Sequence, residues 1–504
     1  MPDIIVIGGG PGGTAAATRA AQLGAQVTVI ERAHLGGNCV NNNCIPLTSL
    51  LASVELYRRI GQAGDMGIQV GPASLNVPGM IARKDRIVQD LREGITGLLP
   101  TFGIEIVQGQ ARLVDAKTVE VDGQRLRATR AIILATGARW APLPPGVEDV
   151  LRPDEAIKLD SVPGRLLIWG GGASDIEFAT LYAALGSQVT LAVDGPYPLP
   201  MEDYEIGQRL QGILQNQGIQ VMNDVRVKSA MRTGGGLDVT LSGLKGETPV
   251  VVDKLLWAGR VPATNGLGLE EAGVKLADGA VIVDARMQTS VPCVYALGDL
   301  TGGRMYSSLA TAGGLVAAEN AMGRNRRLDQ RAVPRYAFSI PEVATVGLTE
   351  DEATDKGYDV EVANIAYGTN TRAMGLGEVE GGIKFVTDRK LGKVLGVHIV
   401  GHRATELIAE ATLGIQLEAL AEDFAWAIRI HPTLSESMVE AGRAILGQAL
   451  TPAVGVTWEM RCFSSSTRRS SRWVVQAEAK ICVHPPTISG NSALKSSQPS
   501  AVDA

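Results

Sequence analysis

Residues 4–13 read IIVIGGGPGG, and this stretch decides the fold of the chain. A short apolar run followed by glycines is typical of a buried strand that turns sharply into a helix. Gly8, Gly10 and Gly13 fill the positions of a G-x-G-x-x-G loop, and an alanine-rich segment follows. The next strand-like run ends in Glu31, at the distance expected for a carboxylate that binds ribose. The stretch therefore predicts a βαβ unit that binds a dinucleotide at the start of its helix.

A second copy of this pattern begins at residue 166 and reads LLIWGGGASDIE. Gly170 and Gly172 keep the first two glycine positions, but Asp175 stands at the third, and Val193 stands where the closing carboxylate is expected. A side chain at position 175 would crowd the contact of helix and strand, and its charge would lie near a bound diphosphate. Two interpretations stay open: a second dinucleotide site, or a retained fold that binds a nicotinamide cofactor poorly or not at all.

A pair of cysteines follows the first unit, in the segment GGNCVNNNCIP at residues 36–46. Cys39 and Cys44 can close a small disulfide if the backbone between them coils. A helix beginning near Cys44 would stabilise a thiolate there through its N-terminal dipole, and a low thiol pKa favours disulfide exchange. We expect a thiol–disulfide couple beside a redox cofactor, and no metal. The alternatives are half of a zinc site and two unrelated buried thiols. Only His34 is near in sequence, and the other cysteines are Cys293, Cys462 and Cys482.

Composition excludes several classes of protein. A chain of 504 residues is expected to form about three domains of ~150 residues each. Its net charge of −6 gives no basic surface for nucleic acid, and no apolar run reaches the roughly 18–20 residues of a membrane span. Strand-like residues begin at Asp3, so we expect no signal peptide, and five cysteines in this length do not form a secreted disulfide framework. The expected location is cytoplasmic.

Later segments indicate how the chain is organised. Residues 131–138 form an apolar run that ends in a small-residue turn before a proline cluster. Residues 291–299 end in Asp299, whose carboxylate can accept a hydrogen bond from a sugar-like hydroxyl or simply form a turn. From about residue 332 the pattern predicts a separate α+β domain, and residues 451–504 predict a disordered tail. The expected strands of that domain are 338–348 and 394–401, and its expected helices are 349–356 and 404–419.

The motifs follow one colinear order over residues 1–450: the first glycine loop, the cysteine pair, Ala-Thr-Gly (135–137), the second glycine loop, Gly-Arg-x-Pro (259–262), Tyr-Ala-x-Gly-Asp (295–299) and His-Pro-Thr-Leu-Ser-Glu (431–436). In this order the chain resembles the flavoprotein pyridine nucleotide–disulfide oxidoreductases, most closely their dihydrolipoamide dehydrogenase branch. The resemblance implies an α/β fold with two Rossmann-like dinucleotide-binding domains and a C-terminal α+β dimerisation domain. The implied divisions are an FAD-binding domain (1–147 and 262–331), an NAD-binding domain (148–261) and a dimerisation domain (332–450).

The resemblance also implies roles for single residues. Cys44 would face the flavin, and Cys39 would exchange with the substrate. FAD would be held by Gly8, Gly10, Gly13 and Glu31 at its ADP half, by Asp299 at its ribityl chain, by Ala310 beside the flavin, and by Thr136 and Gly137. The nicotinamide cofactor would be held by Gly170, Gly172 and Glu177. We expect NAD rather than NADP, because Val193-Asp194-Gly195 offers no arginine for a 2′-phosphate.

His431 and Glu436 complete the implied site. A dithiol must lose a proton before it attacks a disulfide, and an imidazole titrates in the useful range. Glu436 would orient and charge-stabilise the ring of His431, and in the family this pair comes from the second subunit of a homodimer. The alternative for His431 is an ordinary structural histidine. The implied reaction takes electrons from a dihydrolipoamide-type small dithiol or a lipoyl carrier and passes them through FAD to NAD.

Two departures from the family pattern fall on the nicotinamide side of the flavin. Thr48 stands where the family has a lysine paired with the glutamate that matches Glu177, so Glu177 would be unpaired and its pKa raised if it is buried. Asp175 is the second departure. Other functions therefore stay open: an NADPH-dependent disulfide reductase of the glutathione- or mercuric-reductase type, and a flavin-bearing redox sensor with impaired nicotinamide binding.

Overall fold

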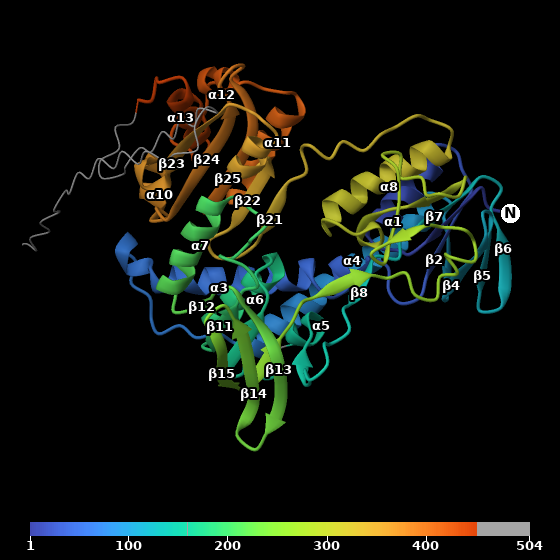
Figure 1. Ribbon diagram of the computed structural model, residues 1–504, viewed down its shortest axis with the longest axis horizontal. Helices are drawn as coiled ribbons and strands as arrows, with labels where there is room; N and C mark the ends of the chain where they lie inside the picture. The colour runs from blue at the N-terminus through green and yellow to red at the C-terminus, as the bar shows by residue number, and fades with distance from the viewer. Residues whose placement is uncertain (159, 451–504) are drawn as a thin grey trace, which may run out of the picture.

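The structure is a computed structural model that describes residues 1–158 and 160–450. The segment 451–504, predicted to be a disordered tail, lies outside the described residues. Figure 1 shows a C-terminal body above a central one, with the N-terminal body to one side. No helix in the described part of the chain is both long and apolar enough to cross a lipid bilayer.

The N-terminal body is built on a parallel sheet with the first strand at its centre. Its order is β20 (Val294–Ala296), β7 (Ala131–Leu134), β1 (Ile4–Ile7), β2 (Val27–Glu31) and β3 (Glu105–Gln108). Helices α1 (Pro11–Gln22) and α8 (Ser307–Ala321) cover one face of it. A small antiparallel sheet covers the other face, with strands β4 (Ala111–Asp115), β5 (Thr118–Val121) and β6 (Gln124–Arg127). Because both faces are covered, β1 is apolar throughout and fully buried.

Three helices lie between β2 and β3: α2 (Gly37–Asn41), α3 (Cys44–Gly61) and α4 (Val77–Thr101). Cys44 is the first residue of α3, as the sequence predicts. Leu47, Leu50 and Val54 of α3 are buried in the same hydrophobic cluster as the second sheet. The helix that carries Cys44 is therefore held by the core of the central body.

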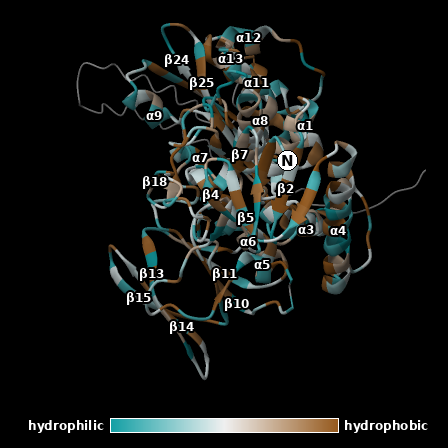
Figure 2. Ribbon diagram, turned by 90° about the vertical axis from the view of Figure 1, so that its right-hand side faces the viewer, coloured by the Kyte–Doolittle hydropathy of each residue, from teal (hydrophilic) through white to brown (hydrophobic). Residues whose placement is uncertain are grey.

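The central body repeats the design of the first with a second parallel sheet. Its order is β12 (Gln220–Met222), β11 (Gln188–Ala192), β10 (Arg165–Trp169), β16 (Lys254–Leu256) and β9 (Val150–Leu151). Its helices are α5 (Pro153–Ala156), α6 (Ala173–Ala184) and α7 (Tyr204–Asn216). An antiparallel meander of β13 (Val225–Thr233), β14 (Gly236–Gly243) and β15 (Gly246–Val252) projects from the lower end of the molecule (Figure 2). One antiparallel pair, β8 (Ala138–Trp140) and β17 (Arg260–Pro262), joins the two bodies.

The C-terminal body is an antiparallel sheet with helices. Its strand order is β21 (Arg335–Ala337), β22 (Val343–Gly347), β25 (Lys393–Gly401), β24 (Gly381–Asp388) and β23 (Val360–Ala366). Its helices are α9 (Glu350–Asp355), α10 (Thr371–Leu376), α11 (Ala404–Gln416), α12 (Ala421–Trp426) and α13 (Glu436–Ile445). Together the three bodies confirm the predicted α/β class with two parallel nucleotide-type sheets and a C-terminal α+β unit.

The structure corrects one predicted strand. Residues 338–348 do not form a single strand, because β21 ends at Ala337 and β22 begins at Val343, and the two strands pair antiparallel. Pro341 lies in the connection, and proline cannot donate a ladder hydrogen bond, so the chain turns there rather than continuing. The predicted helix 404–419 is confirmed in place, but it ends at Gln416.

Candidate functional site

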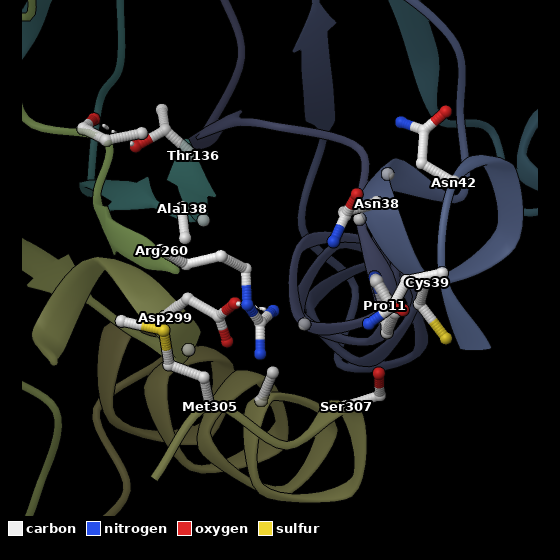
Figure 3. A pocket seen from close by; sticks show the side chains of 18 of the residues that line it. Pro11, Asn38, Cys39, Asn42, Thr136, Ala138, Arg260, Asp299, Met305 and Ser307 are labelled. Atoms are coloured by element: carbon white, nitrogen blue, oxygen red, sulfur yellow. Dashed lines mark hydrogen bonds and ion pairs between the residues drawn. The ribbon is translucent and has the colours of Figure 1, made fainter. Parts of the chain in front are cut away.

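A cleft of about 1040 Å³ lies where the N-terminal and central bodies meet. Both glycine loops line it, as do both cysteines and residues of β17 and α8. Figure 3 shows Cys39 and Pro11 on one wall, Arg260 and Asp299 on the opposite wall, and Ser307 between them. The structure therefore brings most of the sequence-predicted site residues into one space.

The first glycine loop is shaped for close approach of a ligand. A Cβ added to Gly13 would lie 1.9 Å from the carbonyl oxygen of Gly8, so only glycine fits at this position. The N–H of Gly9 donates to Glu31 Oε2 at 2.7 Å, which fixes the carboxylate at the end of β2 beside the loop. The N-terminus of α1 opens onto the cleft here, and such an end favours an anionic diphosphate. These residues fit the ADP half of FAD.

The remaining predicted FAD residues line the same cleft: Thr136, Gly137, Asp299 and Ala310. Thr136 Oγ1 donates to the carbonyl of Ala263 at 3.1 Å. Asp299 accepts a hydrogen bond from Arg260 at 3.1 Å, as Figure 3 shows. Burial raises the pKa of Asp299, and the charge of Arg260 opposes that rise. In the sequence Arg260 is only part of the Gly-Arg-x-Pro motif, and the structure adds it to the site.

The two cysteines are free thiols in contact with one another. Cys39 lies in α2, and the Sγ of Cys44 lies 3.5 Å from Ser307 Oγ of α8. Interaction with Cys44 lowers the pKa of Cys39 to about 7, although burial opposes this. Interaction with Cys39, together with burial, raises the pKa of Cys44. The two thiols titrate as one pair, so the thiolate expected at Cys44 stays a prediction.

Neither alternative for the cysteines gains support from their surroundings. Over residues 1–158 and 160–450, no three His, Cys, Asp or Glu side chains gather so as to hold a metal ion. The thiols also line the cleft rather than lying apart in separate cores. Ser307, which sequence analysis missed, has no sequence motif of its own, because its position depends on how α8 packs against α1.

Residues of the second glycine loop lie in the same cleft, including Gly172, Asp175 and Glu177. Gly170, at the end of β10, is not among the lining residues. Glu177 Oε1 accepts a hydrogen bond from the N–H of Phe338, which belongs to the C-terminal body. Burial raises the pKa of Glu177 to about 8, which confirms the expected direction.

Thr48 makes only local contacts on its helix. Its Oγ1 donates to the carbonyl of Cys44 at 2.7 Å, so the hydroxyl turns back onto the first turn of α3.

His431 and Glu436 lie together but away from the cleft of their own chain. His431 Nδ1 is 2.9 Å from Glu436 Oε1, and the second carboxylate oxygen accepts from the N–H of Thr433. The hydrogen bonds from Thr433 and His431 outweigh partial burial and lower the pKa of Glu436. The His431 side chain is 72% exposed and is not among the residues that line the cleft. Within one chain the structure does not bring this pair to the cysteines.

Comparisons with known proteins identify the family. The model for "Pyridine nucleotide-disulphide oxidoreductase" matches residues 2–323, and the model for the dimerisation domain of that family matches residues 333–442. A dihydrolipoyl dehydrogenase of Thermus scotoductus is 41% identical over 455 residues, which is 89% of this chain and 98% of the relative. One from Geobacillus stearothermophilus is 36% identical and spans 88% of this chain and 96% of the relative.

Solved structures agree with these matches. LpdA from Mycobacterium tuberculosis superposes with a TM-score of 0.81 at 29% identity, over 88% of this chain and 99% of the other. The HOCl-induced flavoprotein disulfide reductase RclA from Escherichia coli gives a TM-score of 0.77 at 27% identity, over 87% of this chain and 99% of the other. Members of the family bind FAD and a nicotinamide cofactor, and the dimerisation domain implies a homodimer. This chain belongs to the pyridine nucleotide-disulphide oxidoreductase family and is a flavoprotein disulfide oxidoreductase.

Proposed function

We propose that this protein oxidises a dihydrolipoamide-type dithiol through Cys39 and Cys44 and delivers the electrons to NAD. The observation that carries the proposal is that both thiols lie in the cleft that the first glycine loop lines. The overall reaction is dithiol plus NAD⁺ giving cyclic disulfide, NADH and a proton. FAD, which the first loop fits, would supply a carrier for two electrons between the thiol pair and the nicotinamide.

The exchange steps need only thiol chemistry. With Cys39 and Cys44 joined as a disulfide, a substrate thiolate attacks Cys39 Sγ, which forms a mixed disulfide and releases Cys44. The second substrate sulfur then attacks the first, which closes the substrate disulfide and releases Cys39 as a thiolate. A thiol of low pKa leaves faster, so the pKa of about 7 at Cys39 favours this second step.

We assign the proton transfer to His431 of a second copy of the chain. The imidazole is exposed on the C-terminal body and held by Glu436, so it is free to approach another subunit. Its Nδ1 is engaged with the carboxylate, which leaves Nε2 to take the proton of the substrate thiol. The homodimer would then be the functional unit.

Turnover of dihydrolipoamide with NAD⁺ tests the proposal in the FAD-loaded protein. Cys39→Ser and Cys44→Ser should each lower the rate by roughly 10³-fold or more, because each removes one sulfur of the couple. Cys293→Ser is the matched control and should keep full activity. An active Cys39→Ser or Cys44→Ser variant contradicts the proposal, and so does an inactive wild type that turns over glutathione disulfide with NADPH instead.

A second candidate function rests on Asp175, which stands in the second glycine loop. Under this alternative the protein is a flavin-bearing redox sensor that exchanges electrons with dithiols but not with nicotinamides. Anaerobic addition of NADH to the oxidised flavoprotein separates the two functions. Rapid loss of the visible flavin absorbance, or a new long-wavelength thiolate–flavin band, supports the dehydrogenase, whereas an unchanged spectrum at every pH supports the sensor.

A further inference from the structure

The two glycine loops of this chain differ at their third position. In the first loop, a Cβ on Gly13 would lie 1.9 Å from Gly8, so helix and strand touch there. The second loop places Asp175 at the matching position and keeps it buried, with 9% of its surface exposed. The carboxyl folds back over the loop: a Cβ added to Gly170 would lie only 2.2 Å from Asp175 Oδ2. The space beside the first glycine of this loop is thus filled by a carboxyl group.

Asp175 also accepts a hydrogen bond from a backbone N–H at the helix start that a bound dinucleotide would use. Its Oδ2 accepts a hydrogen bond at 3.0 Å from the N–H of Gly172, the residue that caps the N-terminus of α6. Free N–H groups at a helix start are what binds the diphosphate in this type of loop. The second oxygen, Oδ1, is buried and has no hydrogen-bond partner among the residues that the structure describes. Asp175 lines the cleft, so this unsatisfied oxygen lies at the ligand site.

The charges around Asp175 decide how it responds to pH. Burial raises its pKa to about 7, against the hydrogen bond from Gly172 and the charge of Arg260 on β17. Arg260 also pairs with Asp299, so its charge is shared between two carboxylates. Glu177, on the same helix as Asp175, is a second buried carboxyl group. Glu202 in the cleft wall forms an ion pair with Arg335.

We propose that Asp175 determines the affinity of the second loop for a dinucleotide diphosphate, which binds when the Asp175 carboxyl is neutral and is repelled when it is ionised. The neutral carboxyl can donate its proton from Oδ1 to a phosphate oxygen, which satisfies an atom that otherwise has no partner. The ionised carboxylate instead competes for the N–H of Gly172 and repels the two negative charges of the diphosphate. The inference deepens the proposed function, on whose nicotinamide half it rests.

Binding of NAD⁺ to the oxidised, FAD-loaded protein tests this by calorimetry between pH 5.5 and 8.5. The wild-type Kd should be flat at low pH and should rise towards tenfold per pH unit above about pH 7, as binding linked to one proton requires. Asp175→Asn should bind tightly at all pH values, because the amide is a neutral donor. Asp238→Asn, on the exposed face of the meander strand β14, is the matched control and should keep the wild-type profile.

Each outcome decides the inference. A flat wild-type profile, or weaker binding by Asp175→Asn than by wild type at pH 8, overturns it while leaving the proposed function in place. Asp175→Gly, which restores the third glycine, supplies a second variant and should also bind independently of pH. Absence of NAD⁺ binding in the wild type and in both Asp175 variants at every pH would overturn both this inference and the nicotinamide half of the proposed function.

Discussion

At the scale of single residues, the thiol pair shows how one contact divides acidity between two chemically identical groups. Interaction between the two thiols lowers the pKa of Cys39 and raises that of Cys44. The pair therefore loses its first proton near neutral pH and holds the second tightly. The dipole of α3 favours a thiolate at Cys44 instead, so the site of the first deprotonation is a prediction that alkylation tests.

Alkylation of the reduced protein measures this division. Iodoacetamide should modify Cys39 at a rate that rises with pH, with a midpoint near pH 7. Mass spectrometry of the Cys39 peptide measures the extent of modification. Cys44→Ala removes the thiol that interacts with Cys39 and should move that midpoint upward towards the ordinary thiol value. The Cys293 peptide, read in the same samples, controls for reagent and unfolding. An unchanged midpoint in Cys44→Ala would show that the contact does not set the acidity of Cys39.

Glu177 gives a second prediction at this scale, on stability. Burial raises its pKa from 4.5 to about 8, so the unfolded state ionises first as the pH rises. The free energy of unfolding should therefore fall between about pH 5 and 8, by up to about 1.4 kcal/mol per pH unit from this group. Glu177→Gln mimics the protonated form and should lose this slope. Urea unfolding at pH 5, 6.5 and 8 measures it, and a stability difference between variant and wild type that does not grow with pH would refute the assignment.

Sequence reasoning located most of these residues but not their contacts. Gly13 and Glu31 follow from the spacing of a motif whose backbone geometry is fixed: Gly13 packs against Gly8, and Glu31 lines the cleft. The fold-back of Asp175 onto Gly172 and the contact of Cys44 with Ser307 depend on side-chain rotamers and on packing between distant segments. Local sequence does not encode these.

At the scale of elements, buried charges fasten the central body to the C-terminal sheet. Lys384 of β24 is 1% exposed and contacts Asp203 at 2.9 Å and Glu350 at 2.6 Å. Asp203 also caps the start of α7 by accepting from the N–H of Glu205. Beside this cluster Arg335 of β21 pairs with Glu202, which lies in the cleft wall. These ion pairs connect residues 202–205 of the central body, on its cleft side, to the C-terminal body, which carries His431.

Lys384→Met tests how much these buried ion pairs contribute to the stability of the fold. Removing the cation leaves buried carboxylates uncompensated, so the free energy of unfolding should fall by about 3–5 kcal/mol in denaturant titration. Lys228→Met breaks an exposed pair with Glu247 and should cost at most about 1 kcal/mol. Equal effects of the two substitutions would mean that the buried cluster contributes no more than a surface pair.

The elements themselves were largely predictable. Glycine loops, the start of α3 and the helix after Arg403 follow from composition and periodicity along one stretch of chain. The sequence pattern did not show that residues 338–348 divide into a connection and the strand β22, because the apolar pattern continues across Pro341 while the backbone reverses.

At the scale of the whole molecule, His431 lies apart from the thiols of its own chain. The cysteines line the cleft, whereas His431 is exposed on the C-terminal body. Shortly before it in sequence come Trp426, Ile428 and Ile430, three large apolar side chains that are also exposed. Apolar side chains gathered on a surface mark a protein interface, and the family dimerisation domain covers these residues. In a symmetric homodimer of this kind, the shared site that we propose would take each imidazole from the other subunit.

Co-expression of two inactive variants tests the shared site. Cys39→Ser lacks a sulfur and His431→Gln lacks the base, so each homodimer should be nearly inactive. A mixed dimer carries one intact site, formed by the cysteines of the His431→Gln chain and the imidazole of the other. Random pairing should restore about one quarter of the wild-type rate. No restoration, although mass spectrometry detects mixed dimers, would place the base and the thiols in the same subunit.

The half-reaction with dithiol tests the central claim most directly, because it does not depend on nicotinamide binding. Dihydrolipoamide is mixed anaerobically with the oxidised FAD-loaded protein, and the visible flavin absorbance is followed by stopped flow. The wild type should rapidly lose this absorbance or gain a long-wavelength thiolate–flavin band, and Cys39→Ser and Cys44→Ser should do neither. A wild-type spectrum that shows neither change, or an equally fast change in both cysteine variants, would contradict the assignment of the thiol pair.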